Sequence, residues 1–317
     1  MAFRPSAHHG TAHLFSPKLI AFEHKPTHAS SASPNVLIWV GGLGDGLLTV
    51  PYPTILASRL PPAWSLAQPL LTSSYDGWGV SSLARDADEL ARLVAYFRSA
   101  RPGAKVVLMG HSTGCQDAIE YVSSPLNPSA AQHRAPLDGI ILQAPVSDRE
   151  AMVEALGQEH YDKVNAAAQG FVDEGRAEDI LPFGLTARIF QKTPISARRW
   201  LSLASPDKRG ADDFFSSDLD DAAVRKTFGG VPKGQRVCVL YSGADEFVPK
   251  DLDKEELVHR WGRAVREAGG VWEDEFGGVV QGATHNLKRN GDDVVGDLCR
   301  RVIGFLAKVE KGEAAHL

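Results

Sequence analysis

Four short apolar runs constrain the fold of this chain more than any other feature of its sequence. These runs are Val36–Val40, Val106–Met109, Ile140–Leu142 and Val237–Tyr241. Every position in them is apolar, which is typical of strands buried on both faces of a parallel sheet, because a strand with one exposed face alternates apolar and polar residues. We expect two further strands at Leu19–Phe22 and Trp64–Leu70.

The segments between these runs have the periodicity of helices. Apolar residues recur at steps of three and four from Leu83 to Phe97, which predicts a helix packed on the sheet, with Ser81 or Ser82 as its N-cap. Similar patterns over 257–265 and 302–309 predict two later helices. Strands that alternate with helices form right-handed crossovers, so the sequence predicts the α/β class with a mostly parallel, doubly wound sheet.

Residues 148–225 interrupt this alternation between the third and fourth apolar runs. They are helical in pattern but irregular, with Pro182, Pro194 and Pro206 as breaks. The chain has 317 residues, of which 43% are hydrophobic and 23% charged, and this suffices for one large domain with a well-buried core. We therefore expect a single domain over residues 1–317, with residues 148–225 inserted as a helical cap.

The stretch Gly110–Gly114 has the pattern G-x-S-x-G around Ser112. It follows the apolar run Val106–Met109 and precedes a helical stretch from Cys115 to Val122. Strand, sharp turn and helix is the arrangement of a nucleophile elbow, in which the serine adopts a strained backbone conformation. Serine needs a base to become a good nucleophile. The alternative interpretation is that Ser112 only caps a helix.

Two residues later in the chain are candidates for the acid and the base that would activate Ser112. Asp245 follows the run Val237–Tyr241, and His285 lies further on, before the last expected helix. The chain order Ser, Asp, His is that of the α/β-hydrolases, in which the aspartate accepts the Nδ1 hydrogen of the histidine. Asp148, which follows the third apolar run, is the alternative acid.

A glycine-rich loop, Gly41–Gly46, follows the first apolar run. In α/β-hydrolases this loop donates one backbone N–H to the oxyanion, and the residue after the nucleophile donates the second. We expect Leu43 to provide the first N–H, with Gly44 as the alternative, and Thr113 to provide the second. The glycine spacing also resembles a dinucleotide-binding loop, but prolines interrupt the helix that should follow at once.

Charge and cysteine content argue against several classes of protein. A formal net charge of −5 disfavours a nucleic-acid partner, which needs a basic surface. No stretch approaches the ~20 apolar residues of a membrane span, so we expect no membrane partner. Three cysteines, an odd and sparse set, predict a cytoplasmic protein, although the C-terminal Ala315–Leu317 loosely resembles a peroxisomal signal. We expect no metal site and no cofactor.

Longer stretches resemble a known family. The stretches Gly41–Gly46, Ser74–Leu83, Gly110–Asp117 and Arg198–Ala204 are similar to an uncharacterised-domain (DUF1749-type) family of fungi and plants. The resemblance extends from about Leu37 to Phe305 and implies an α/β-hydrolase fold. One characterised branch, the fungal fusarinine C esterases, hydrolyses ester bonds of hydroxamate siderophores inside the cell to release iron. The resemblance implies the same activity for this chain.

These observations predict a serine esterase that acts on a small-molecule ester, with a ferric fusarinine-type siderophore as the candidate substrate. Tyr75 and Trp78 are candidates for substrate contacts, and core packing is the alternative for both. The aspartates between residues 212 and 221 are candidates for an acidic rim that attracts amines, and a solvated loop is the alternative. The competing functions are a non-catalytic small-molecule-binding protein on the same fold and a thioesterase or acyltransferase.

Overall fold

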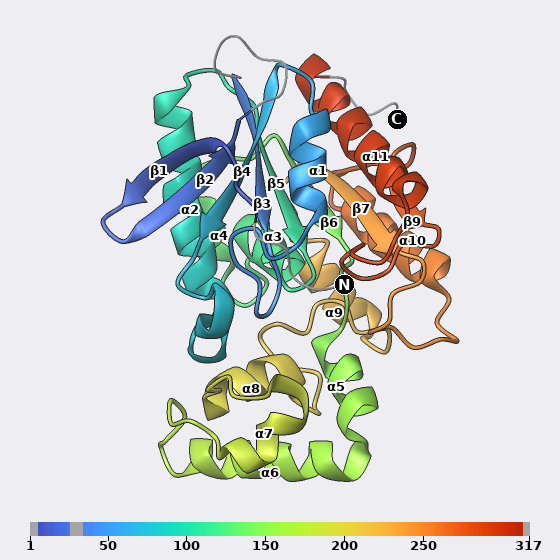
Figure 1. Ribbon diagram of the computed structural model, residues 1–317. Helices are drawn as coiled ribbons and strands as arrows, with labels where there is room; N and C mark the ends of the chain where they lie inside the picture. The colour runs from blue at the N-terminus through green and yellow to red at the C-terminus, as the bar shows by residue number, and fades with distance from the viewer. Residues whose placement is uncertain (1–5, 26–33, 313–317) are drawn as a thin grey trace.

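The computed structural model describes residues 6–25 and 34–312, and within them nine strands form one sheet (Figure 1). The strand order is β1-β2-β4-β3-β5-β6-β7-β8, and β9 also pairs with β7. The strands are β1 Gly10–Ser16, β2 Leu19–His24, β3 Asn35–Val40, β4 Trp64–Leu70, β5 Val106–His111, β6 Gly139–Gln143, β7 Arg236–Ser242, β8 Val271–Trp272 and β9 Gly278–Val280. All pairings among β3 to β9 are parallel, whereas β1 and β2 extend the β4 edge as an antiparallel hairpin.

Helices cover both faces of this sheet (Figure 1). α1 and α11 pack on one face, and α2, α3 and α10 pack on the other. The elements outside the β6–β7 connection are α1 Tyr52–Arg59, the 3-10 helix η1 Tyr75–Val80, α2 Leu83–Ala100, α3 Gly114–Val122, α4 Pro128–Gln132, α10 Lys254–Glu267 and α11 Asp292–Lys311. The predicted doubly wound, mostly parallel sheet is confirmed.

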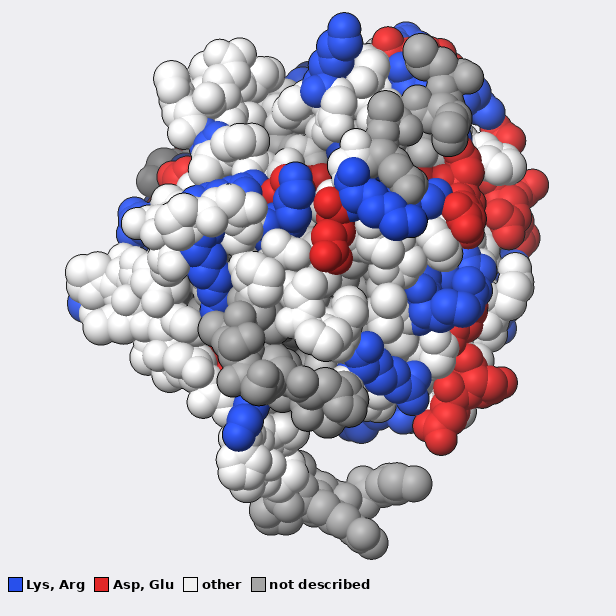
Figure 2. All heavy atoms as spheres, turned by 90° about the horizontal axis from the view of Figure 1, so that it is seen from above, with Lys and Arg blue, Asp and Glu red and all other residues white. Residues whose placement is uncertain are grey.

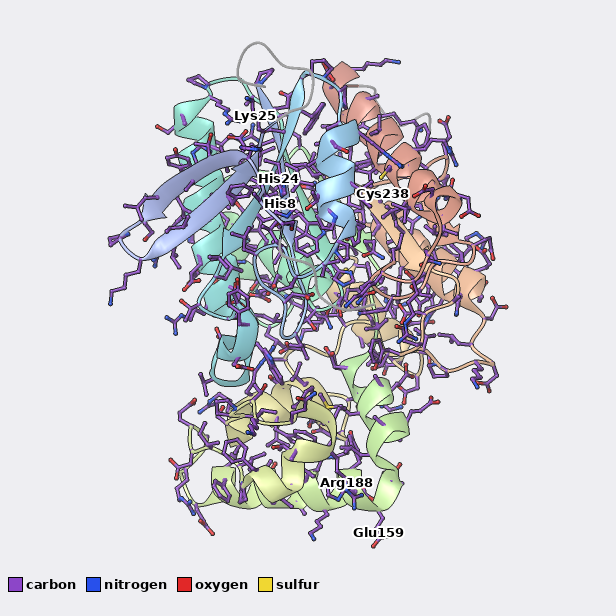
Figure 3. The ribbon with its side chains drawn as sticks, viewed as in Figure 1. His8, His24, Lys25, Glu159, Arg188 and Cys238 are labelled. Atoms are coloured by element: carbon purple, nitrogen blue, oxygen red, sulfur yellow. The ribbon has the colours of Figure 1, made fainter. Side chains whose placement is uncertain are left out.

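The connection between β6 and β7 contains a separate layer of helices beyond one end of the sheet (Figure 1). These helices are α5 Asp148–Leu156, α6 Gln158–Asp173, α7 Phe183–Phe190 and α8 Ala197–Ala204. They enclose a second hydrophobic core, whose largest members are Trp200 on α8 and Trp78 of η1. Glu159 on α6 and Arg188 on α7 lie at the end of the layer furthest from the sheet (Figure 3). We call α5–α8 the helical layer.

After α8 the chain returns to the main body of the protein. Phe214, Phe215 and Leu219 are buried in the same hydrophobic core as strands β3 and β5, and so is Val224 on α9 (Asp221–Thr227). Packing therefore divides residues 148–225 into two parts. Only the part up to α8 forms the helical layer. The remainder packs into the hydrophobic core that also contains residues of β3 and β5.

The helix predicted from Leu83 illustrates how an N-cap and an apolar stripe in the sequence predict a helix. Ser82 is its N-cap and accepts a hydrogen bond from the backbone N–H of Arg85 at 3.3 Å. The stripe that includes Leu90 and Phe97 is fully buried against the sheet. A capped helix with one continuous apolar face has a single favourable way to pack, so its pattern fixes both its start and its orientation.

The end of the molecule opposite the helical layer carries charges of both signs. Figure 2 shows lysine and arginine side chains scattered over this face, with most of its aspartate and glutamate side chains along one side. Among the described residues, no helix is both long enough and apolar enough to cross a bilayer. Ala315–Leu317, the tripeptide with a resemblance to a targeting signal, lies outside the described residues.

Candidate active site

Ser112 lies on a sharp turn between β5 and α3. Its φ angle is +55°, a left-handed conformation that a non-glycine residue rarely adopts, so the predicted strain at this serine is confirmed. The backbone N–H of Ser112 donates to the carbonyl of Gln143 at 3.0 Å, which fixes the turn to the end of β6. A Cβ atom at Gly110 would collide with the backbone of Gly114, so glycine is needed where strand and helix approach.

His285 and Asp245 meet beyond the end of β7. His285 lies in the turn between β9 and α11, and its Nδ1 is 2.8 Å from Oδ2 of Asp245. The other carboxylate oxygen of Asp245 accepts the backbone N–H of Phe247 at 3.0 Å. Glu246 accepts the backbone N–H of His285 at 2.9 Å, and the ring of Phe247 packs edge-on against the imidazole. The imidazole is therefore held by its partner, its own backbone and a neighbouring ring.

A buried network of polar side chains connects the serine turn to the turn that contains His285. Nδ1 of His111 donates to Oε1 of Gln143 at 2.6 Å, and the hydroxyl of Tyr52 donates to the same oxygen at 2.9 Å. The amide nitrogen of Gln143 donates to the carbonyl of His285 at 3.4 Å. Burial, with a further contribution from His285, lowers the pKa of His111 to about 3, so His111 stays neutral. The rings of His111 and His285 are 5.0 Å apart between centroids.

Asp148, the alternative acid, takes a different position. It begins α5, and its Oδ2 accepts a hydrogen bond from the side-chain amide of Gln116 at 3.0 Å. Burial, with a contribution from Asp212, raises the pKa of Asp148 to about 7. Asp245, and not Asp148, is the carboxylate that is hydrogen-bonded to the imidazole of His285.

The glycine-rich loop after β3 packs directly against the serine turn. A Cβ atom built on Gly42 would lie 2.9 Å from Oγ of Ser112 and 3.2 Å from the backbone nitrogen of Thr113. The N–H of Gly42 donates to Asp45. Within the described part of the chain, the N–H groups of Leu43, Gly44 and Thr113 donate to no other group of the protein. Leu43 and Gly44 line the same cavity as Ser112, so the loop offers either N–H, together with that of Thr113, for binding an oxyanion.

These residues surround one large cavity between the sheet and the helical layer. Its volume is about 1050 Å³. The wall on the sheet side includes Leu43, Gly44, Asp45, His111, Ser112, Phe247, His285 and Asn286, and the wall on the other side includes Trp78, Asp148, Ala151, Met152, Ala187, Ile189 and Phe190. Ser112 and His285 therefore open into the same space, and the helical layer provides most of the apolar surface opposite them.

The two aromatic residues expected to contact substrate differ in position. Trp78 lines the cavity, where its ring packs edge-on against Phe190 with 4.7 Å between centroids. Tyr75 does not line the cavity; its ring covers Gly46, and 48% of its surface is exposed to solvent. The structure gives Tyr75 a packing position on the outside of the glycine-rich loop.

The expected acidic rim is absent from the cavity wall, because its aspartates are used elsewhere. Asp212 is buried in an ion pair with Arg199 at 2.6 Å. Asp213 and Asp218 both pair with Arg149. Of the remaining two, Asp220 caps α9 and Asp221 pairs with Arg260. The acidic groups that do line the cavity are Asp45, Asp76 and Asp148.

Sequence reasoning missed several residues of this site. Gln143 joins the serine turn to the histidine turn, and the signal for it is a single polar residue at the carboxyl end of the buried run Ile140–Leu142. Phe247 is an apolar residue two positions after Asp245, on a loop, and 50% of it is exposed. No group of three or more histidine, cysteine, aspartate or glutamate side chains in the described residues is arranged to hold a metal ion.

The fold and this arrangement are those of the α/β-hydrolases. A parallel, doubly wound sheet carries a strained serine after one strand, an aspartate after a later strand and a histidine before the last helix. The chain belongs to the family described as "Protein of unknown function (DUF1749)", whose model matches residues 1–307.

Two relatives of this chain are named as esterases. The chain is 40% identical to Esterase AN6793 of Emericella nidulans, over 95% of this chain and 93% of the relative. It is 38% identical to Fusarinine C esterase sidJ of Aspergillus fumigatus, over 95% of this chain and 96% of the relative.

Solved structures agree with this assignment. The siderophore hydrolase EstB of Aspergillus fumigatus is 37% identical, with a TM-score of 0.83 over 98% of this chain and 100% of that chain. A variant of monoglyceride lipase from Saccharomyces cerevisiae has a TM-score of 0.62 at 13% identity, over 98% of each chain, and shares the fold alone.

Proposed function

We propose that this protein is a serine esterase, with Ser112 as nucleophile, His285 as base and Asp245 as the acid that orients it. The observation that carries the proposal is the hydrogen bond between His285 and Asp245 at 2.8 Å, on a histidine that lines the same cavity as the strained serine. The names of the relatives, which include two esterases, support the same reaction.

The reaction follows from these positions. Oγ of Ser112 attacks the ester carbonyl carbon, and Nε2 of His285 takes the hydroxyl proton. Asp245 stabilises the imidazolium that forms, and the N–H groups of Leu43 and Thr113 bind the negatively charged oxygen. His285 then gives its proton to the leaving alcohol. A water molecule, deprotonated by His285, hydrolyses the acyl-serine and restores the free enzyme.

The substrate that we propose is a bulky ester, of the fusarinine-type hydroxamate siderophore class. A cavity of about 1050 Å³ is at the upper end of what small-molecule sites need, so it suits a large substrate better than a short-chain ester. The names of two relatives, a fusarinine C esterase and a siderophore hydrolase, point to this class. Iron would enter as part of such a substrate.

Two further parts of the proposal concern organisation and location. We propose that, of the insertion expected at residues 148–225, the helical layer acts as a cap within one domain, because α5 and α7 form part of the cavity wall opposite Ser112. We also propose that the protein works in the reducing environment of the cytoplasm. Its three cysteines, Cys115, Cys238 and Cys299, are all buried and free.

A fluorophosphonate probe tests the nucleophile. Wild type should be labelled, and Ser112→Ala should lose labelling and lose at least about 10⁴-fold in kcat on any ester that wild type cleaves. Equal labelling of the two proteins would refute the assignment. An unlabelled wild type with measurable affinity for esters would favour a non-catalytic binding protein.

Product analysis tests the substrate class. A ferric cyclic trihydroxamate ester and simple nitrophenyl esters should be offered side by side, with and without an added alcohol or coenzyme A thioester. We expect ring opening of the siderophore ester with water as acceptor. Turnover of nitrophenyl esters beside an inert siderophore would remove the siderophore proposal and leave the esterase, and transfer to the added alcohol would indicate an acyltransferase.

A further inference from the structure

Asp45 ties the glycine-rich loop into a closed turn. Its Oδ2 accepts the N–H of Gly42 at 2.9 Å, and its own N–H donates to the carbonyl of Gly42 at 3.1 Å. The other carboxylate oxygen accepts the hydroxyl of Thr49 at 3.1 Å. The carbonyl of Asp45 accepts the N–H of Tyr75 at 2.8 Å, which anchors the turn to η1. Asp45 is therefore hydrogen-bonded to Gly42, which precedes it in the loop, and to Thr49, which follows it.

These bonds remove the N–H of Gly42 from the backbone donors of the loop that remain unused. The N–H groups of the next two residues, Leu43 and Gly44, donate to no other group of the described residues, and Leu43 is the one that directly follows Gly42. Without the carboxylate, the N–H of Gly42 would be a further free donor, and the turn from Gly42 to Asp45 would lose one of its two closing bonds. The direction of the Leu43 N–H depends on that turn.

The loop has little room for displacement. A Cβ atom on Gly42 would lie 2.6 Å from Cβ of Ser112, and one on Gly41 would lie 2.5 Å from Cβ of Asp45. An oxyanion donor must lie about 2.7–3.1 Å from the oxygen that it stabilises, so a shift of a fraction of an ångström in this loop alters the transition state more than the bound ester.

We propose that Asp45 is a positioning residue of the oxyanion hole: its hydrogen bond to Gly42 holds the loop so that the N–H of Leu43 faces the carbonyl oxygen attacked by Ser112. Asp45 acts through the backbone and does not contact the reacting atoms. The inference rests on the proposed esterase function. Burial raises the pKa of Asp45. An amide at this position keeps an oxygen that can accept the N–H of Gly42.

The experiment compares Asp45→Ala and Asp45→Asn with wild type, using a nitrophenyl ester and a boronic acid. Boron accepts Oγ of Ser112 and becomes tetrahedral, His285 takes the serine proton, and one boron-bound oxygen occupies the oxyanion hole. Asp45→Ala should lower kcat and boronate affinity together, by about 10- to 1000-fold, while KM changes less than about threefold. Asp45→Asn keeps an acceptor for Gly42 and should retain both values within about tenfold of wild type.

A matched control is Asp207→Ala, which removes an exposed aspartate that accepts the backbone N–H of Arg209 at 3.1 Å in a turn remote from the cavity. It should leave kcat and boronate affinity unchanged. The inference is overturned if Asp45→Ala keeps wild-type kcat and boronate affinity, or if Asp45→Asn loses as much as Asp45→Ala.

A second variant tests the inference if Asp45→Ala does not fold, and a labelling experiment separates failure of the inference from failure of the proposed function. If Asp45→Ala does not stay folded at the assay temperature, Thr49→Val, which removes the hydroxyl that bonds both Asp45 and the backbone of Gly46, should lower kcat and boronate affinity in parallel but to a smaller extent. Unchanged values in Thr49→Val would then overturn the inference. If a fluorophosphonate fails to label wild type, the proposed function itself fails; if it labels wild type and Asp45→Ala at equal rates, only this inference fails.

Discussion

Nδ1 of His285 lies 2.8 Å from Oδ2 of Asp245, and the Asp245 side chain is fully buried. A buried carboxylate in this position holds one tautomer of the ring and stabilises the imidazolium during proton transfer. Asp148 also lines the cavity, but its carboxylate is bonded to the amide of Gln116. Replacing each aspartate by its amide should therefore affect kcat to a different extent.

Asp245→Asn should lower kcat by about 10⁴-fold, because a neutral amide does not stabilise the imidazolium and its NH₂ group, donating to Nδ1, holds His285 in the wrong tautomer. Asp148→Asn should lower kcat by less than about tenfold, since its partner Gln116 can bond an amide as well. Steady-state kinetics on a nitrophenyl ester measures both. A larger loss in Asp148→Asn than in Asp245→Asn would reverse the assignment of the acid.

Gly42→Ala should inactivate the enzyme without unfolding it. The added methyl group would lie 2.6 Å from Cβ and 2.9 Å from Oγ of Ser112, so the serine or the loop must move. We expect kcat to fall by at least about 100-fold, the size of effect that loss of an oxyanion donor produces. Gly170→Ala on α6 is the control: its Cβ would meet nothing within 4 Å, so activity should not change. Wild-type kcat in Gly42→Ala would contradict the loop position described above.

Arg199 is the single described arginine that pairs with Asp212 inside the protein, and it also donates to the carbonyl of Trp78 at 3.0 Å. Arg199→Leu should lower the free energy of unfolding by about 3–5 kcal/mol, because it leaves a buried carboxylate without its partner. The adjacent Arg198 is exposed and pairs with Glu178 on the surface, so Arg198→Leu should cost less than about 1 kcal/mol. Urea denaturation measures the two values. Similar values for both variants would show that the Arg199 pair is not a buried one.

Asp86→Asn should change how stability depends on pH. Burial raises the pKa of Asp86 to about 7, although Ser73 and Arg199 lower it. Between about pH 4 and pH 7 the unfolded chain loses this proton while the folded protein keeps it, so the folded state loses stability as the pH rises. Asp86→Asn removes that loss. Its free energy of unfolding relative to wild type should rise from pH 4 to pH 7, by about 4 kcal/mol at most, and stay level above pH 8.

The control for this prediction is Asp88→Asn, an exposed aspartate on the same helix. Its difference from wild type should stay within about 0.5 kcal/mol at every pH. Thermal or urea unfolding between pH 4 and pH 8 provides the comparison. A constant difference between Asp86→Asn and wild type over that range would contradict a raised pKa in the folded state.

The sheet and the serine turn were predictable because their signals are local. The apolar run Val106–Met109 and the glycines around Ser112 stand within nine residues of sequence, and the structure places β5, the strained turn and α3 there. The small strands β8 and β9 were not predictable. They have two and three residues, and pairing with β7 rather than their own composition makes them strands.

The walls of the cavity were harder to predict, since they depend on contacts between distant segments. Tyr75 and Trp78 are three residues apart, yet of the two only Trp78 lines the cavity. Tyr75 begins η1 with a left-handed backbone, φ +56°, so regular helical spacing does not predict where its side chain lies. The aspartates between residues 212 and 221 looked like a solvated or substrate-facing group. Their partners Arg149 and Arg199 lie on helices α5 and α8, and no spacing in the sequence predicts those pairs.

The hydrophobic core of the helical layer, which Trp78 of η1 shares, contains no residue of β5 or β7, the strands that precede Ser112 and Asp245. Mutations in α5 or α7 can therefore resize the space above the serine while the proton-transfer groups keep their supports. Exchange of the segment from α5 to α8 between relatives would change which esters enter before it changes how they are cleaved. This division allows the substrate of the enzyme to change during evolution while the reaction stays the same.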